Sequence, residues 1–181
     1  MGKQFQEISP ELQDFIRNQK IFFVGTAAQD GRVNISPKGY DTLTVIDSNK
    51  VIWLNLTGSG NETAAHLLKN DRMTIMFCAF EGKPLILRLY GQAKIFHPRD
   101  KEFNNYISFF DDYAGSRQII ELNVDLVQTS CGYAVPYMDY KEERDVLKKS
   151  HLKKGKEKIE SYWDEKNRTS IDGFDTNILE N

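Results

Sequence analysis

Hydrophobic and polar positions follow a helical pattern over the first twenty residues and a strand-like pattern after them. Leu12, Phe15 and Ile16 recur at helical spacing. Just before them, Ser9-Pro10-Glu11 offers a capping hydroxyl, a proline suited to a first helical turn, and an acid for the positive helix end. The pattern therefore predicts a first helix that ends near Lys20.

From Ile21 onward, short hydrophobic runs alternate with turn residues, which is typical of strands joined in hairpins. Pro37 lacks a backbone donor and should therefore lie at a sheet edge, a bulge or a strand end. Consecutive hairpins favour antiparallel pairing, and this many strands in one small domain would close into a barrel. The six to seven predicted strands occupy residues 21–28, 33–36, 42–46, 51–56, 73–80, 85–96 and 119–129.

Helices are predicted in two of the connections and near the C-terminus. Residues 62–70 and 98–113 show helical spacing, and residues 141–166 are charged and mostly helical, with a break at Gly155. The polar tail after residue 166 should be either loosely ordered or draped over a neighbouring subunit. We expect one domain, with residues 1–140 as the barrel and residues 141–181 as a charged helical extension and tail.

Composition and charge narrow the function classes. The 181 residues are 40% hydrophobic and 28% charged, which suits one domain with a core that needs no disulfide or metal. The net charge of −2 gives no general attraction for nucleic acid or anionic lipid. Lysines in 148–158 are interleaved with glutamates, and Leu152, Ile159 and Trp163 form a packing stripe, so a solvated amphipathic helix is expected there. With no membrane-length apolar run and no secretion signal, a cytoplasmic location is predicted.

The sequence lacks the usual signatures of metal and nucleophilic chemistry. Its two cysteines and three histidines show no metal-ligand spacing, and neither cysteine has a nearby histidine. His66 is interpreted as a helix-face residue rather than a catalytic base. No catalytic residue and no metal ligand is therefore assigned.

The strongest local signal is the strand–loop–helix from Trp53 to Leu68. Small residues let backbone amides converge, and the helix N-terminus adds its positive end, so the segment favours an anion site. Ser59, Asn61 and Thr63 would add side chains that hydrogen-bond phosphate oxygens. The alternative is a flexible turn in which Asn61 is an ordinary helix cap.

Three basic residues are candidates to neutralise such an anion. Lys38 follows a strand end distorted by Pro37 and Gly39, where a cation can reach a cavity mouth; the alternative is a surface lysine. Arg88 lies in an apolar strand and either points outward or is buried with a partner. Arg117 carries the same ambiguity.

Taken in order, four segments resemble the pyridoxamine 5′-phosphate oxidase-like, FMN-binding split-barrel family. The segments are Gly31–Gly39, Trp53–Leu67, Asn70–Phe77 and Arg88–Gly91. The resemblance implies a mainly β split barrel with peripheral helices, and a homodimer that holds two FMN molecules at its interface. By position it implies cofactor contacts from Ser36, Lys38, Gly39, Asn55, Thr57, Ser59, Asn61, Thr63, Arg88 and Arg117.

The chain resembles a branch of that family other than the vitamin B6 oxidase. That enzyme has basic residues where this chain has Asn61 and Thr63, and its C-terminal Arg and His motif is not found in residues 164–181. The resemblance implies an FMN-dependent oxidoreductase acting on a small molecule, with a small-molecule substrate or electron donor as partner. The alternatives are a non-catalytic flavin- or haem-binding protein, and a barrel that binds nucleic acid or protein without flavin; the acidic balance weakens the last.

Overall fold

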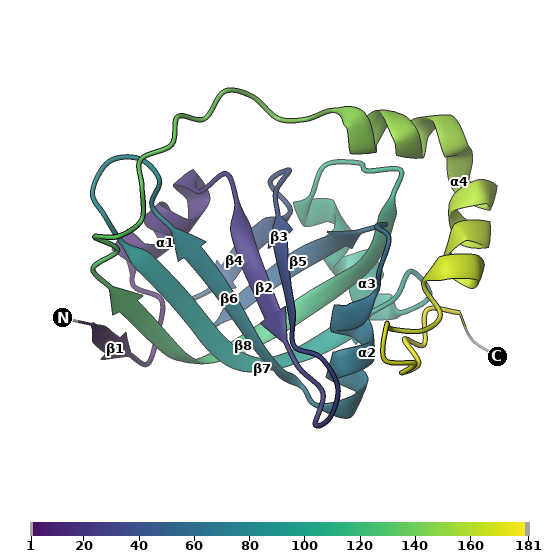
Figure 1. Ribbon diagram of the computed structural model, residues 1–181, viewed down its shortest axis with the longest axis horizontal. Helices are drawn as coiled ribbons and strands as arrows, with labels where there is room; N and C mark the ends of the chain where they lie inside the picture. The colour runs from purple at the N-terminus through teal and green to yellow at the C-terminus, as the bar shows by residue number, and fades with distance from the viewer. Residues whose placement is uncertain (1, 180–181) are drawn as a thin grey trace.

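Residues 2–179 are described by a computed structural model, and they form one curled antiparallel sheet with helices around it (Figure 1). The strand order is β3-β2-β6-β7-β8-β5-β4, and β1 pairs with β8. Because the end strands β3 and β4 do not pair with each other, the barrel remains split. The strands are β1 (Lys3–Phe5), β2 (Phe22–Thr26), β3 (Asn34–Lys38), β4 (Leu43–Asp47), β5 (Lys50–Leu56), β6 (Arg72–Cys78), β7 (Ile86–Phe96) and β8 (Ser116–Ser130).

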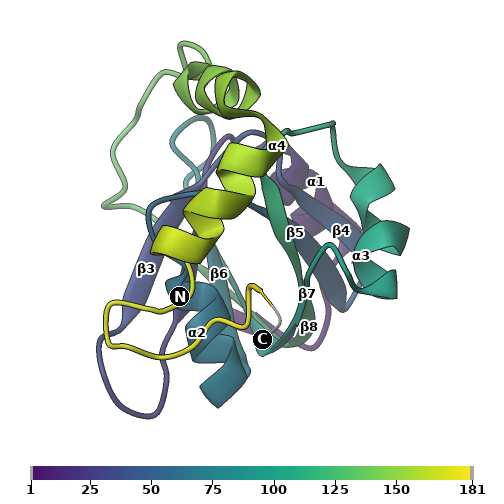
Figure 2. The same ribbon diagram turned by 90° about the vertical axis from the view of Figure 1, so that its right-hand side faces the viewer.

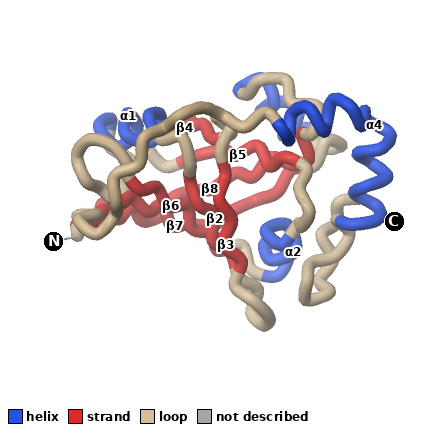
Figure 3. Tube along the Cα trace, turned by 45° about the horizontal axis from the view of Figure 1, so that its top comes forward, coloured by secondary structure: helices blue, strands red, loops and turns tan. Residues whose placement is uncertain are grey.

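The helices lie outside the sheet, and α2 and α4 lie near the same end of it (Figure 3). The first helix begins after Ser9, whose hydroxyl accepts a hydrogen bond from the amide of Leu12, as its capping role requires. The helices are α1 (Pro10–Asn18), α2 (Glu62–Lys69), α3 (Lys101–Tyr106), the short 3-10 helix η1 (Ile107–Phe109) and α4 (Val146–Lys166).

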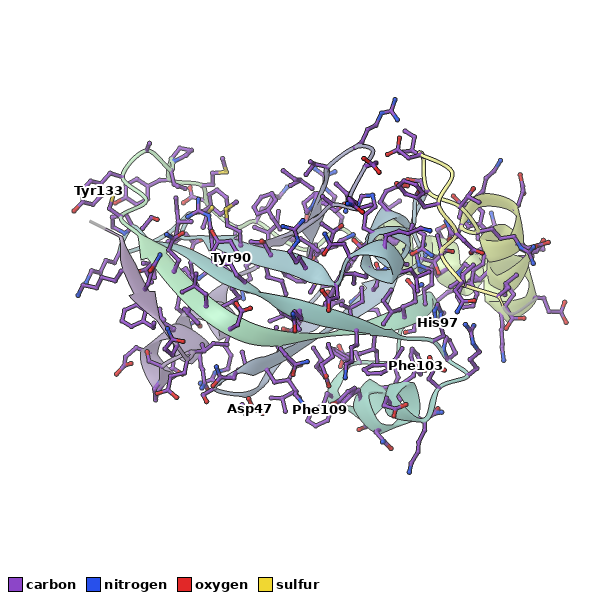
Figure 4. All side chains as sticks on the ribbon, turned by 90° about the horizontal axis from the view of Figure 1, so that it is seen from below. Asp47, Tyr90, His97, Phe103, Phe109 and Tyr133 are labelled. Atoms are coloured by element: carbon purple, nitrogen blue, oxygen red, sulfur yellow. The ribbon has the colours of Figure 1, made fainter. Side chains whose placement is uncertain are left out.

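Strand β5 is apolar at nearly every position because both of its faces are covered. Val51 and Trp53 point into the barrel core. Ile52 and Leu54 point the other way and pack against Phe103, which Figure 4 shows between α3 and the sheet. Alternate side chains of a strand face opposite sides, so two buried faces require a continuous hydrophobic run.

Two long strands bend where β7 meets β8, and Gly91 makes the bend possible. The pairing shifts between Tyr90 and Gly91, so that Asp125 is skipped as a β-bulge. A Cβ atom at Gly91 would lie 1.9 Å from the carbonyl oxygen of Asn123, which leaves no room for a side chain. The bend also lets β8 pair with β5 along its first half and with β1 along its second half.

Most of the predicted elements are confirmed, and the differences have local causes. Strand β3, which contains Pro37, lies at one end of the sheet order, as the missing proline donor requires. The sequence did not predict β1, a short and fully exposed strand without a hydrophobic signal. The helix expected over residues 98–113 is limited to residues 101–109, because Phe110 returns to an extended backbone conformation.

The charged C-terminal helix differs from its prediction in its start, which is Val146 and not residue 141, and in one face. The expected break occurs at Gly155, whose φ of 72° is outside the helical region. Ile159 and Trp163 are buried as expected, whereas Leu152 is 72% exposed and the neighbouring His151 is buried instead. The non-helical residue between the two halves rotates one half relative to the other, so the predicted packing stripe does not continue from the first half into the second.

The segment after α4 packs against its own chain, which differs from the expectation of a loosely ordered tail, while its draping over a neighbouring subunit stays a prediction. It passes across α2 in Figure 2, and Ile178 packs with Ile159 and Trp163 in a small apolar cluster. Within residues 2–179, no helix combines the length and the apolar character that a membrane crossing demands. The cytoplasmic location stays a prediction.

Candidate functional site

A cleft of about 680 Å³ opens where β3, β5, the start of α2 and the C-terminal segment meet. Its walls therefore come from parts of the chain that are far apart in sequence, from residue 34 to residue 171. The lining residues are mostly small or polar: Asn34, Ser36, Pro37, Lys38, Asn55, Leu56, Gly58, Ser59, Gly60, Asn61, Glu62, Thr63, Arg117, Lys166, Thr169, Ser170 and Ile171.

Strand β3 contributes one polar face to the cleft. Its alternate residues Asn34, Ser36 and Lys38 are partly buried, while Ile35 and Pro37 between them are exposed. Lys38 Nζ lies 5.0 Å from the centre of the Trp53 ring. Burial and the positive charge of Arg117 lower the pKa of Lys38 to about 8. Lys38 is thus a partly desolvated cation at the cleft wall, not a surface lysine.

The loop between β5 and α2 is built around Asn61, which does not act as a helix cap. Asn61 is 2% exposed, and its side chain makes no capping hydrogen bond. Its Nδ2 instead donates to the carbonyl oxygen of Asn167 at 3.3 Å, and its Oδ1 has no hydrogen-bond partner among residues 2–179. The interpretation of this segment as a flexible turn with an ordinary cap is therefore wrong.

Arg117 is a buried cation without an acidic partner. It is 2% exposed, and its Nη1 donates to the carbonyl oxygen of Gly60 at 3.1 Å and to Asn167 Oδ1 at 2.8 Å. Burial lowers its pKa to about 10, so it keeps its charge at neutral pH. Within residues 2–179, no carboxylate pairs with it. A buried charge of this kind is costly unless a ligand compensates it.

Unsatisfied polar atoms gather at the same place. Asn61 Oδ1, Arg117 Nε and Gln118 Nε2 are buried without a hydrogen-bond partner in the described structure. Gln118 lies beside the cleft because its Oε1 accepts from Asn55 Nδ2 at 3.1 Å. Buried polar groups in proteins are normally paired, so orphaned ones indicate a ligand or ordered water. Two uncompensated cations and these free polar atoms suit an anionic, polar small molecule.

A chain of polar contacts runs from the cleft to His66 on the buried face of α2. Ser36 Oγ donates to Asn34 Oδ1 at 3.0 Å, and Asn34 Nδ2 donates to Thr63 Oγ1 at 3.2 Å. Asn34 Nδ2 also reaches Thr26 Oγ1 at 3.4 Å, and that hydroxyl lies 3.1 Å from His66 Nδ1. These contacts fix the orientation of the side chains that β3 presents to the cleft.

The structure brings together seven of the ten residues expected to contact a cofactor, and their role as ligands stays a prediction. Ser36, Lys38, Asn55, Ser59, Asn61, Thr63 and Arg117 line the cleft. Thr57 lies behind it, where its hydroxyl donates to the carbonyl oxygen of Gly115 and accepts from Trp163 Nε1. Gly39 follows Lys38 outside the lining. Arg88 lies on β7 with Nη1 3.3 Å from Ser130 Oγ, so it does not reach this cleft within one chain.

Sequence reasoning missed the part of the site that comes from the C-terminus. Lys166, Thr169, Ser170 and Ile171 line the cleft, but no local pattern links them to residues a hundred positions earlier. Asn34 was missed as well, although alternation with Ser36 and Lys38 would have placed it on the same face. Glu62 is the one carboxylate among the described lining residues, and it accepts the amide of Ile171 at 3.1 Å.

The described residues form a split β-barrel with a polar cleft at one end, and known structures share this fold. HupZ from Group A Streptococcus has the same fold, with a TM-score of 0.54 and 22% identity over 66% of this chain and 91% of that chain. A pyridoxamine 5′-phosphate oxidase-like protein from Lactobacillus delbrueckii gives a TM-score of 0.54 at 17% identity, covering 68% and 94% of the two chains.

The sequence pattern of the pyridoxamine 5′-phosphate oxidase family matches residues 8–131. The chain belongs to this family. A curated relative, the pyridoxamine 5′-phosphate oxidase family protein ustO of Aspergillus flavus, is 36% identical over 140 residues, which are 75% of this chain and 56% of ustO. The chain thus spans little more than half the length of that relative.

Proposed function

We propose that this protein is an FMN-binding flavoprotein, and that it acts as an oxidoreductase on a small molecule. The observation that carries the proposal is the pair of cations, Lys38 and Arg117, at this cleft. Glu62, the one carboxylate among the described lining residues, accepts the Ile171 amide and pairs with neither cation. The phosphate monoester of FMN supplies the missing negative charge. The polar remainder of the cleft suits a hydroxyl-rich chain such as ribityl.

The lining residues fall into two groups along the cleft, one suited to the phosphate and one suited to the ribityl chain. Arg117 and Lys38 would neutralise the phosphate. Ser59 in the loop before α2 and Thr63 at the start of the helix would donate hydrogen bonds to it. Asn55 and Ser36 on the neighbouring strands would contact the sugar-like chain. When bound, FMN supplies two-electron redox chemistry, and the protein's part is to bind, orient and shield it. This division explains why the chain needs no catalytic dyad.

The cleft favours flavin over haem. Haem iron is held by His, Met, Cys or Tyr side chains. None of the described residues that line the cleft is of those types. The three histidines, including His66 on the buried face of α2, lie outside the lining. A haem-binding role would thus need an axial ligand from elsewhere.

A homodimer is part of the proposal because one face of the sheet exposes apolar residues. Val33 and Ile35 are each 70% exposed beside a groove of about 630 Å³ that Phe23, Met76 and Tyr90 also line. Exposed apolar patches of this kind mark interaction surfaces. Arg88 alternates with Tyr90 on β7 and so shares its outward face. A dimer through this face would place Arg88 at the interface, where it could contact a cofactor bound between the two subunits.

The test is an absorbance spectrum of purified protein after soaking with FMN and desalting. Retained flavin bands at about one FMN per chain, with a dimer by light scattering, are expected. Reduction of the bound flavin by added NADH or NADPH would then separate an oxidoreductase from a protein that only binds flavin. A colourless protein with no measurable FMN affinity would refute the cofactor assignment.

A further inference from the structure

Asn167 joins the C-terminal segment to two parts of the cleft at once, the loop of residues 58–61 and Arg117. It is fully buried. Its Oδ1 accepts from Arg117 Nη1 at 2.8 Å, and its Nδ2 donates to the carbonyl oxygen of Gly58 at 3.2 Å. Its own carbonyl oxygen accepts from Asn61 Nδ2 at 3.3 Å. One residue at the end of α4 thus holds the loop and the arginine in a fixed relation.

The chemistry of this contact is informative because the partner of the buried arginine is neutral. An aspartate has nearly the same shape as an asparagine and would form the ion pair that a buried guanidinium normally requires. An amide instead fixes the guanidinium through one hydrogen bond and leaves its positive charge uncompensated. Arg117 Nε also has no partner within residues 2–179.

We infer that Asn167 is a positioning residue that orients Arg117 and the 58–61 loop while keeping the arginine charge free for an anionic group of the ligand. The identity of this ligand as FMN rests on the proposed function. It goes further by making the C-terminal segment a required wall of the site, supplied by the same chain. It also explains why residue 167 is uncharged: a neutral side chain there lets the site select a phosphorylated ligand over an uncharged one.

Other contacts hold the segment in place, so a substitution at residue 167 can be interpreted locally. Trp163 Nε1 donates to Thr57 Oγ1 at 2.8 Å just before Asn167. After it, the amide of Ile171 donates to Glu62, and Asp172 pairs with Arg32. Thr176 is fully buried as well. Replacing the Asn167 side chain should therefore leave the segment docked.

The test compares FMN with riboflavin, which lacks the phosphate, in Asn167→Asp, Asn167→Ala and the wild type. We expect Asn167→Asp to weaken FMN binding by roughly 30-fold or more and to change riboflavin affinity by less than about threefold. Asn167→Ala should weaken FMN binding by roughly three- to tenfold, since Arg117 loses its orientation but keeps its charge. Asn105→Asp, an exposed change on α3, is the charge-matched control and should match the wild type.

Each outcome separates this inference from the proposed function. Equal losses for FMN and riboflavin would reduce Asn167 to a structural role and overturn the inference, and so would FMN binding by Asn167→Asp at the wild-type level. If the wild type binds neither flavin, inorganic phosphate is the second probe, with the melting temperature as readout. Stabilisation by phosphate that Asn167→Asp abolishes would uphold the inference while the flavin assignment fails. No stabilisation of the wild type would overturn both.

Discussion

Asp172 in the C-terminal segment pairs with Arg32, which lies 140 positions earlier in the turn between β2 and β3. Its Oδ2 also accepts the backbone amide of Arg32 at 2.7 Å. The backbone hydrogen bond is the main cause that keeps the pKa of Asp172 below its ordinary value, and the guanidinium adds to it. The pair ties the outer end of the cleft wall to an otherwise exposed hairpin.

We expect Asp172→Asn to loosen this end of the segment without unfolding the barrel. The amide loses the ion pair and weakens the hydrogen bond to Arg32, while the barrel core does not contact the residue. Native-state hydrogen exchange should show the amide of Ile171 exchanging roughly tenfold faster, with core strands unchanged. Asp139→Asn, an exposed change outside this segment, is a suitable control. Unaltered exchange at Ile171 would mean that the pair does not hold the segment.

Lys38→Met should stabilise the ligand-free protein and weaken FMN binding. The methionine keeps the packing of the lysine stem beside Trp53 but removes a desolvated charge next to Arg117. The free energy of unfolding should rise by about 1 kcal/mol in urea titrations. FMN affinity should fall roughly tenfold in the same variant. Lys101→Met, at an exposed position on α3, should change neither quantity. A lower free energy of unfolding in Lys38→Met would contradict the interpretation that the desolvated charge of Lys38 destabilises the ligand-free protein.

The lowered pKa of Lys38 predicts opposite pH trends for stability and for FMN affinity. Between about 8 and the ordinary value of 10.5, the unfolded chain still binds a proton that the folded chain has released. The contribution of Lys38 to the free energy of unfolding therefore rises with pH in that window. FMN affinity should fall over the same range because the phosphate loses a cationic partner.

Titrations of wild type and Lys38→Met between pH 7 and about 9.5 isolate this contribution. Arg117, whose pKa is about 10, keeps most of its charge in that range and is common to both proteins. The difference between the two proteins in free energy of unfolding, and the difference in FMN affinity, should each vary with pH. Parallel curves would show that Lys38 does not titrate there.

Gly91→Ala should damage the barrel, because the new Cβ would lie 1.9 Å from the Asn123 carbonyl oxygen, a backbone atom that cannot rotate away. We expect a loss of about 3 kcal/mol in the free energy of unfolding, measured by urea titration. Gly58→Ala is the comparison, since a Cβ there meets nothing within 4 Å. Equal effects in the two variants would argue against a packing constraint at the bulge.

The sequence predicted the parts of this structure that local physics determines. Period-2 runs, turn residues and the Ser9 cap are readable in short windows, and they correspond to β2 through β8, α1 and α2. Strand β1 was not predictable, because its three residues are exposed and gain their structure only by pairing with β8. Pairing between distant segments produces no pattern that a short stretch of sequence could show.

The site was predictable to the extent that its residues lie on predicted elements. The distorted strand end pointed to Lys38, the small-residue loop before α2 pointed to Asn61, and the family resemblance added Ser36; all three line the cleft. The sequence could not show that Arg117 reaches this region while Arg88 does not, since both are single basic residues in apolar strands. Their difference depends on which strand neighbours β5, and β8 is that neighbour.

The distribution of the cleft walls along the chain has a consequence for synthesis. Strand β8 ends at Ser130, whereas the last lining residue is Ile171, about 40 residues later. At translation rates of roughly 5 to 20 residues per second, the ribosome needs about 2 to 8 seconds to add that stretch. During this interval every barrel strand exists, but the site lacks Asn167 and its outer wall. Under the proposed function, FMN loading would follow the synthesis of the C-terminal segment, and the nascent barrel would carry an uncovered Arg117 in the meantime.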